Sequence, residues 1–508
     1  MLKDDLMRSD VSGSAPLSVE TSSPPAAGWR LEHTYAQLPA VFHSPVAPTP
    51  VRAPRLIALN RPLAASLGLD ADALAGDEGA AWLAGNGLPP GAAPLAQAYA
   101  GHQFGHFTTL GDGRAILLGE QVTPRGERFD IQLKGPGPTP YARRGDGRAA
   151  LGPMLREYII SEAMHALRIP TTRSLAVAAT GELVWRQQGR LPGAVLTRVA
   201  ASHIRVGSFQ WAAVQEDEGA LRALLEYTVQ RHYPELAAAE NPAHALLEAV
   251  IERQAALIAQ WQVVGFIHGV MNTDNMALSG ETIDYGPCAF MDAYDPATVF
   301  SSIDTYGRYA YGNQPRIAQW NLARLAESLS PVLHREEEAA VALATKSLES
   351  FTARFAHHWL AGMRKKLGLF NEEPADRELA DTLLKWMHEL KADFTNTFAA
   401  LAESTATDAA AAKDPEFARW HEMWQARLGR QPQSSDESLQ LRRAHNPAFI
   451  PRNHLVEAAL AAAEQGDLSV MHRLLDVLTN PFDHERDEPD YRRPAPAGGA
   501  CYQTFCGT

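Results

Sequence analysis

Apolar and polar residues alternate over short stretches between residues 100 and 200, and Gly, Pro and charged residues separate the stretches. This alternation is typical of half-buried strands joined by turns, and it predicts strands over residues 114–122, 128–135, 172–179, 182–188 and 193–200. Residues 152–167 instead repeat apolar positions at helical spacing, for example at Leu155, Ile159 and Ala163. We therefore expect a small sheet interrupted by one helix.

From residue 208 to about 479 the helical period dominates, as in residues 245–269 and 453–467. Residues 29–96 are mixed, with short helices predicted near 62–69 and 71–84, the second broken at Gly76. Residues 1–28 are rich in Ser and Pro, so a disordered arm is expected there. The prediction is an α+β chain in four parts, namely the arm at 1–28, a β-rich lobe with its extension at 29–207, a helical lobe at 208–480 and a tail at 481–508.

Composition narrows the classes of partner. The 46 basic and 59 acidic residues give a formal net charge of −13, which argues against broad binding to nucleic acid or anionic membranes, since both favour basic surfaces. The chain shows no signal-peptide core at its start and no apolar run of about 18 residues. Three cysteines are too few to cross-link 508 residues, so a reducing compartment is expected. We predict a cytoplasmic protein with neither nucleic acid nor membrane as partner.

Five features occur in the order that a protein-kinase-like nucleotide site requires. Gly111 and Gly113 lie in a turn where backbone amides could approach phosphate oxygens, although a plain hairpin turn is the alternative. Lys134 ends a predicted strand on its polar face, as a phosphate ligand or as a surface lysine. Glu157 follows on the predicted helix, where it would pair with Lys134 or be solvated.

The last two features lie in the helical half. Residues His268 to Asn275 have the spacing of the kinase catalytic loop H-R-D-x-x-x-x-N, but Val270 stands where the catalytic Asp is expected. Valine cannot accept a proton, so phosphoryl transfer with that base is excluded. Asp284 begins a D-Y-G segment, and with Asn275 and phosphate oxygens it makes a sensible Mg²⁺ site. Asp274 adds an unusual carboxylate beside them.

An arginine-rich stretch precedes Glu157 in the chain. Its members surround Asp146 and are Arg143, Arg144, Arg148 and Arg156. Such a cluster suits a polyphosphate ligand, and a solvated basic loop is the alternative interpretation.

Together these segments resemble the selenoprotein O family (SelO, also called YdiU). The resemblance runs through YAGHQFGHFTTLGDGRAILLGE, through the stretch from DIQLKGPGPTPYARRGDGRAALG to TTRSLAV, and through FIHGVMNTDNMALSGETIDYGPCAFMD and HNPAFIPRNHLVEAAL. It covers nearly the whole chain after the arm. It implies a protein-kinase-like bilobal fold, with one key helix in a small β-rich N-lobe and with a large helical C-lobe. It also implies that ATP binds in a flipped orientation and that AMP is transferred to other proteins with loss of pyrophosphate.

The resemblance assigns roles residue by residue. It implies Asp274 as proton acceptor, a Lys134–Glu157 ion pair, and Asn275 and Asp284 as ligands of Mg²⁺ or Mn²⁺. The nucleotide-binding residues that it implies are Gly111, Gly113, Arg114, Lys134, Asp146, Gly147, Arg198, Arg205 and Asp284. The acceptor would be a Ser, Thr or Tyr hydroxyl of a target protein. Some family members transfer UMP from UTP to Tyr or His, and the sequence leaves that choice open.

The cysteines form a separate hypothesis. Some family members carry selenocysteine third from the C-terminus, where this chain has Cys506, with Cys501 nearby. Cys288 follows the D-Y-G segment, and a disulfide from it to the tail could clamp the site.

Two other functions stay open from the sequence. One is a true kinase that transfers the γ-phosphate, which Val270 disfavours. The other is a catalytically silent pseudokinase that binds nucleotide and acts as a scaffold. A scaffold does not need a complete metal site, so Asn275 and Asp284 disfavour it.

Overall fold

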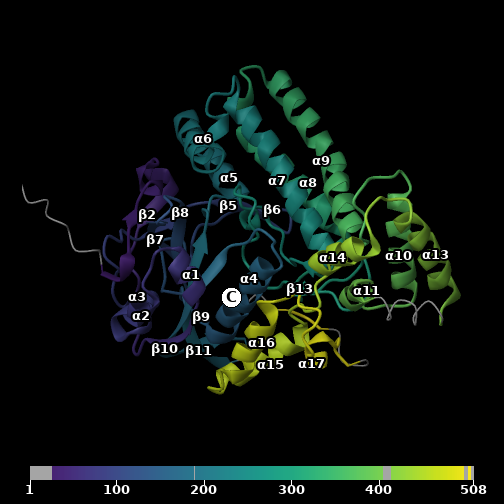
Figure 1. Cartoon of the computed structure of the whole chain (residues 1–508). Coiled ribbons are helices and arrows are strands. Elements are labelled where there is room, and N and C mark those ends of the chain that lie inside the picture. Colours follow the sequence, from purple (N-terminus) through teal and green to yellow (C-terminus); the bar gives the residue numbers. More distant parts are fainter. Residues whose placement is uncertain (1–25, 188, 404–412, 497–501, 505–508) are drawn as a thin grey trace, which may run out of the picture.

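The computed structural model describes residues 26–187, 189–403, 413–496 and 502–504. Residues 1–25 of the predicted arm, together with Cys501 and Cys506, lie outside the described residues. A sheet-rich lobe comes first in the chain and a helical lobe follows, as the colour gradient of Figure 1 shows. The α+β class and the kinase-like order of a small β-rich lobe followed by a large helical one are confirmed.

The main sheet belongs to the first lobe. Its strands are β1 (Leu31–Glu32), β2 (His43–Pro45), β3 (Arg55–Leu59), β4 (Leu95–Gln97), β7 (Ala115–Val122), β8 (Arg128–Lys134), β9 (Ala149–Ala150), β10 (Arg173–Arg186) and β11 (Gly189–Ala200). Their order is β2-β4-β7-β8-β11-β10-β3, with β1 beside β7 and β9 beside β11. Two separate two-stranded sheets pair β5 (Ala100–Gln103) with β6 (His106–Thr109), and β12 (Phe266–Ile267) with β13 (Ala289–Phe290).

The two strands predicted at 172–179 and 182–188 are one long strand, β10. Its pairing with β11 shifts register between Ala179 and Leu183, so the irregularity that separates the two sequence patterns is a bulge within one strand. The short strands β1 to β6 were not predicted, because two to five residues hold too little alternation to be recognised.

Strand β8 shows how the pattern of the sheet positions polar groups. Ile131 and Leu133 pack into an apolar core on one face with the extension helices α1 (Arg61–Ser66), α2 (Ala71–Ala75) and α3 (Asp77–Ala84). The alternate residues Asp130, Gln132 and Lys134 are also buried, and they lie on the opposite face because side chains alternate along a strand. That polar row ends at Lys134, at the cavity described below.

Helix α4 (Leu151–Ala166) is the single long helix predicted between the strands. Leu155 and Ile159 pack with Val177 and Leu196 of the sheet in the largest core. Helices α15 (Asn453–Glu464) and α16 (Ser469–Leu478), which are yellow in Figure 1, return from the far end of the chain to pack on α4. Helix α4 is therefore held between the sheet and the last part of the helical lobe.

The helical lobe is built around α7 (Pro242–Val264), which packs against α8 (Gln314–Leu333) and α9 (Glu337–Lys366). The α7 helix begins where the Asn241 side chain accepts a hydrogen bond from the His244 amide, and it ends at Gly265, whose φ of 73° suits glycine. The other helices are α5 (Val206–Val214), α6 (Glu218–His232), α10 (Asp376–Glu389), α11 (Phe394–Ala400), α13 (Pro415–Leu428), α14 (Ser435–His445) and α17 (Pro489–Arg492). Within the described ranges, none of the helices combines the length and the apolar character needed to cross a membrane.

Candidate active site

A cavity of about 970 Å³ contains almost every site residue expected from the sequence. Its lining includes Gly111, Gly113, Arg114, Lys134, Asp146, Gly147, Arg198, Arg205, Asp274, Asn275 and Asp284. Glu157 lies behind this lining and contacts it through ion pairs. Residues from the sheet, from an arginine-rich loop and from the helical lobe are thus brought together, over sequence separations that no local pattern spans.

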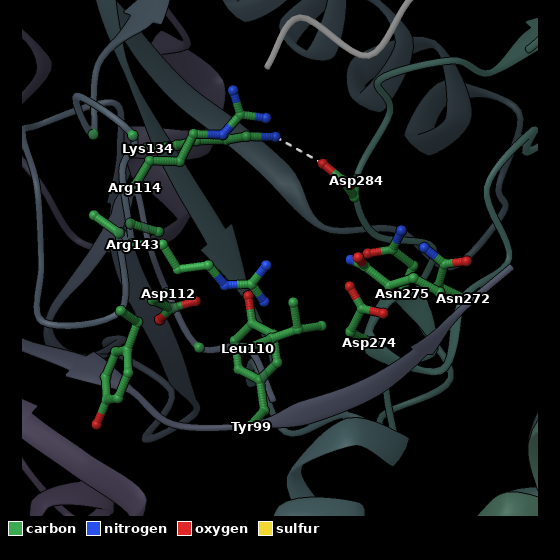
Figure 2. A pocket seen from close by; sticks show the side chains of 18 of the residues that line it. Tyr99, Leu110, Asp112, Arg114, Lys134, Arg143, Asn272, Asp274, Asn275 and Asp284 are labelled. Atoms are coloured by element: carbon green, nitrogen blue, oxygen red, sulfur yellow. Dashed lines mark hydrogen bonds and ion pairs between the residues drawn. The ribbon is translucent and has the colours of Figure 1, made fainter. Parts of the chain in front are cut away.

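Lys134 is the centre of a buried charge network. Its Nζ lies 2.6 Å from Glu157 Oε2 and 2.8 Å from Asp284 Oδ1, and Figure 2 shows it directed at Asp284 across the cavity. Arg198 Nη2 lies 2.5 Å from the other Glu157 oxygen. Because Lys134 is only 6% exposed, its interpretation as a surface lysine is wrong.

The network keeps both carboxylates ionised. Burial would raise the pKa of Glu157, but Arg198 and Lys134 hold it below its ordinary value. Burial opposes ionisation of Asp284 too, and Lys134, Arg198 and Arg114 together hold its pKa far below the ordinary value. The backbone of Asp284 has a φ of 68°, an uncommon conformation for a non-glycine residue that often marks functional positions.

Asp274 lies across the cavity from Lys134, among the labelled residues of Figure 2. Burial raises the pKa of Asp274 to about 6, although the nearby Arg205 guanidinium acts in the opposite direction. Its Oδ1 is buried without a hydrogen-bond partner among the described residues. A carboxylate that lines a cavity and has its pKa raised toward neutrality is suited to accept a proton from a bound hydroxyl.

The loop 268–275, which has kinase catalytic-loop spacing and is called the catalytic loop below, is held by contacts with both lobes. Thr273 accepts a hydrogen bond from the His102 amide of β5 at 2.7 Å and donates one to Gln210 of α5 at 2.6 Å. The side-chain amide nitrogen of Asn275 donates a hydrogen bond to the Val270 carbonyl at 3.1 Å, which leaves the side-chain amide oxygen for a ligand. The β5–β6 hairpin therefore takes part in positioning Asp274 and Asn275.

Asn275 and Asp284 fit the expected cation as part of its coordination. An amide oxygen and an ionised carboxylate are ligands that Mg²⁺ accepts, with phosphate oxygens and water completing the shell. The described part of the chain has no group of three or more His, Cys, Asp and Glu side chains around a possible metal position.

The glycine turn lies against Tyr141 of the arginine-rich loop. Gly111 has a φ of 123°, and a Cβ there would lie 2.4 Å from the Tyr141 ring. A Cβ at Gly147 would lie 2.1 Å from the backbone of Gly137. Gly111 is required by the close approach of two loops, and Gly147 by the close approach of two parts of one loop. The interpretation of Gly111 as a plain hairpin glycine does not account for its contact.

The arginine-rich stretch divides between two places. Arg143, Arg144 and Arg148 line the cavity, whereas Arg156 points away from it, toward Glu457 at 2.9 Å and the backbone carbonyl of Cys288 at 2.6 Å. The expected polyphosphate cluster is therefore smaller than the sequence indicated. Arg156 differs because it lies on α4 rather than on the loop.

Several cavity residues were not predicted. Tyr99 stacks on the Arg205 guanidinium at 4.4 Å, and Asp112 is buried in the glycine turn, where it accepts hydrogen bonds from the Gln97 amide and from Gln132. Arg186 binds Asp146 at 3.0 Å. Tyr99 and Asp112 lie inside motifs that were recognised as segments, but nothing in their spacing indicates which side chains face the cavity.

Cys288 is buried as a free thiol. Burial raises its pKa to about 12, so it is protonated at neutral pH and is a poor nucleophile in this state. The tail residue Thr504 donates a hydrogen bond to the carbonyl of Pro287, next to Cys288, at 2.6 Å. Because Cys501 and Cys506 lie outside the described residues, the hypothesis of a disulfide to the tail stays untested.

Comparisons with known proteins agree with the geometry. The family model described as protein adenylyltransferase SelO matches residues 27–479. The protein nucleotidyltransferase YdiU of Halalkalibacterium halodurans is 63% identical over 492 residues, which cover 96% of this chain and 100% of that protein. Its counterpart in Bacillus mycoides is 60% identical over 482 residues, or 95% of this chain and 99% of that protein.

A solved structure was matched at lower similarity. It is ROP2 from Toxoplasma gondii, described as a virulence factor with a protein-kinase fold and no enzymatic activity. The match has 12% sequence identity and a TM-score of 0.26, and it covers 58% of this chain and 87% of that chain.

Proposed function

This chain belongs to the SelO family of protein adenylyltransferases, and we propose that its cavity binds ATP and transfers AMP to side-chain hydroxyls of other proteins. The observation that carries the proposal is the position of Asp274. Val270 replaces the usual kinase base, while the buried carboxylate of Asp274 lines the same cavity. A base is therefore present in a different place, which favours an enzyme over a silent scaffold.

Each charged group has a role in this reaction. Lys134, Arg198 and Arg205 neutralise phosphate charge and hold the triphosphate in one geometry. Asp274 accepts the proton of the acceptor hydroxyl while the hydroxyl oxygen forms a bond to the α-phosphorus of ATP. The bond between the α-phosphorus and the oxygen that bridges to the β-phosphate breaks, and pyrophosphate leaves with that oxygen.

The proposal includes a divalent cation held by Asn275 and Asp284, Mg²⁺ or Mn²⁺. When bound, such a cation supplies positive charge at the phosphate oxygens. The ionised state of Asp284 and the free amide oxygen of Asn275 support this assignment.

The proposal allows more than one nucleotide donor and more than one kind of acceptor side chain. We include UTP as a possible second donor and Ser, Thr, Tyr or His as acceptor side chains. The net charge of −13 and the three cysteines support a cytoplasmic enzyme that acts on proteins and has neither nucleic acid nor membrane as partner.

The test follows two labels on one protein. Purified protein with Mg²⁺ is incubated with α-³²P-ATP or γ-³²P-ATP, with bacterial lysate as the source of acceptors. Label from the α-phosphate alone, lost in Asp284→Ala and Asp274→Asn, is the expected result, and Asp274→Asn is expected to keep its affinity for ATP. Label from the γ-phosphate alone would make the protein a kinase. ATP binding without either label would make it a scaffold.

A further inference from the structure

Two segments border the cavity on the side of Asp274. One is the β5–β6 hairpin, whose Gln103 and Phe104 line the cavity, and the other is the loop 301–309, whose Ile303 does so. Both are tied to the catalytic loop through one side chain, because Asn272 Oδ1 accepts hydrogen bonds from the Phe104 amide at 3.0 Å and from the Tyr309 hydroxyl at 2.7 Å. Figure 2 shows Asn272 beside Asn275 and close to Asp274. Both segments therefore lie beside the proposed base, Asp274.

Large apolar side chains are exposed on the same two segments. Phe107 of β6 is 44% exposed, and in the loop Ile303 is 55% and Tyr306 98% exposed. Exposed apolar groups that gather beside a cavity indicate a surface that binds another molecule. Because the reaction needs a second protein at this side of the cavity, the gathered groups fit an acceptor chain.

Arg308 adds a charge to this surface. Its guanidinium carbon lies 4.8 Å from the centre of the Trp320 ring, and Arg324 stacks on the same ring at 4.8 Å. Arg324 has a carboxylate partner, Glu327, at 2.5 Å. Within the described ranges Arg308 has no carboxylate within ion-pair distance, and its Nε is buried without a hydrogen-bond acceptor. The nearby Asp304 carboxylate instead accepts hydrogen bonds from the backbone amides of Arg308 and Tyr309.

Arg308 lies apart from the residues proposed to bind the nucleotide. Lys134, Arg114 and Arg198 line the cavity, and Arg308 does not. It lies at the turn of the hairpin instead, since a Cβ at Gly105 would be 3.7 Å from its guanidinium carbon. A held guanidinium with no carboxylate partner among the described residues, beside exposed apolar groups, matches an acidic side chain flanked by apolar residues.

We propose that Arg308 selects acceptor proteins by binding an Asp or Glu near the modified residue, while Phe107 and Ile303 contact an apolar neighbour of that carboxylate. This inference rests on the proposed function, because it names the kind of protein segment that the same site modifies. It adds specificity and leaves the transfer step unchanged.

The test uses short peptides as acceptors. A central Ser, Thr or Tyr is flanked by Ala and Gly, and a single Glu, Gln or Lys is placed at each neighbouring position in turn. Wild-type protein is expected to label the best Glu peptide about three- to tenfold more efficiently, as kcat/KM, than the matching Lys peptide, as a partly exposed ion pair allows. Arg308→Gln is expected to remove this preference, and Arg308→Glu to reverse it toward Lys. Arg316→Glu, an equal charge change at an exposed position of α8, is expected to keep it.

The outcomes separate the two proposals. A reversal of peptide preference supports the docking role, because damage to the loop alone would lower kcat/KM for all peptides equally. Transfer without acidic preference, or a preference that survives in Arg308→Glu, would overturn this inference and leave the proposed function standing. A raised KM for ATP in Arg308→Glu with unchanged peptide preference would also overturn it. If wild-type protein transfers AMP neither to the peptides nor to lysate proteins, the proposed function fails, and this inference fails with it.

Discussion

Asp274 is surrounded by backbone at its closest contacts. A Cβ at Gly101 would lie 2.6 Å from Asp274 Oδ1, and a Cβ at Gly207 would lie 2.1 Å from the Ala100 carbonyl oxygen and 3.4 Å from Asp274 Cα. The backbones of β5 and α5 thus come as near to the proposed base as they can. The absence of a side chain at Gly101 leaves room for the carboxylate, and its absence at Gly207 lets α5 approach β5 and the Asp274 backbone.

The close contact at Gly101 predicts the effect of adding one methyl group there. Gly101→Ala is expected to lower the kcat of AMP transfer by about 100-fold, since a displacement of about 1 Å at a reacting group can cost that much. ATP affinity is expected to stay within about threefold, because a shift of less than about 0.7 kcal/mol is expected where no phosphate contact changes. The measurement is steady-state transfer together with equilibrium ATP binding.

Gly429→Ala is the matched control. Its Cβ would meet only backbone oxygens at 3.6 and 3.7 Å, which are ordinary contacts, so its kcat should equal that of the wild type. A Gly101→Ala protein with normal kcat would show that the carboxylate position is not critical.

The sequence predicted the site unevenly at this scale. Lys134, Glu157, Asn275 and Asp284 were found because they occur in a fixed order with kinase-like spacing. The ordered motifs could not show that Asn272 joins the hairpin to the loop 301–309, since that contact joins segments distant in sequence.

At the scale of elements, strong periodicity was a better guide than short alternation. Helix α4 and strands β7, β8 and β11 lie within one or two residues of the predicted ends, or extend beyond them in the case of β11. The β5–β6 hairpin was missed, because strands of four residues are stabilised by their contacts with α5 and the catalytic loop rather than by their own pattern. The unpredicted element is thus one that borders the active site.

The contact of α9 with α11 contains an unusual charge. Lys366 is 2% exposed, and its Nζ lies 4.2 Å from the centre of the Phe398 ring. Burial lowers its pKa from the ordinary 10.5 to about 7. The folded state therefore disfavours the charged lysine, and its stability contribution changes with pH.

Lys366→Met is expected to raise the free energy of unfolding relative to wild type most at pH 7 and below, where the unfolded lysine is fully charged. The folded pKa is the lower one, so stability of the wild type rises with pH between 7 and 10.5, and the advantage of the variant should shrink by roughly 1 kcal/mol per pH unit. Chemical denaturation at pH 7, 8 and 9 measures it. Lys365→Met, at the exposed neighbouring position, should show no such trend; an equal trend there would contradict the assignment.

At the scale of the whole molecule, the lobes are joined by a buried ion network on the side of α6. Arg231 of α6 lies 3.4 Å from Glu120 Oε2 of β7 and 3.2 Å from Asp130 Oδ1 of β8. Glu120 is fully buried and Asp130 is 2% exposed. One guanidinium of the helical lobe therefore contacts two buried carboxylates of the sheet, and Asp130 is also bound by His203.

Arg231→Met is expected to destabilise the protein by about 3–5 kcal/mol, because it leaves buried carboxylates uncompensated. Urea denaturation would measure the loss. On the same helix, Arg222 is 52% exposed and pairs with the exposed Glu218, so Arg222→Met should cost roughly 0.5 kcal/mol or less. Similar losses in both variants would mean that the lobes are not held together by this network.

The anchoring of α4 on two sides bears on how such an enzyme can be switched. Many kinases are turned off by swinging the equivalent helix away, which separates the lysine from the glutamate. Here Glu157 is bound to Lys134 and Arg198 on one side, while Arg156 on the other side is bound to Glu457 and to Tyr502 of the tail. An outward swing would break the contacts on both sides at once, so these contacts keep the Lys134–Glu157 pair assembled.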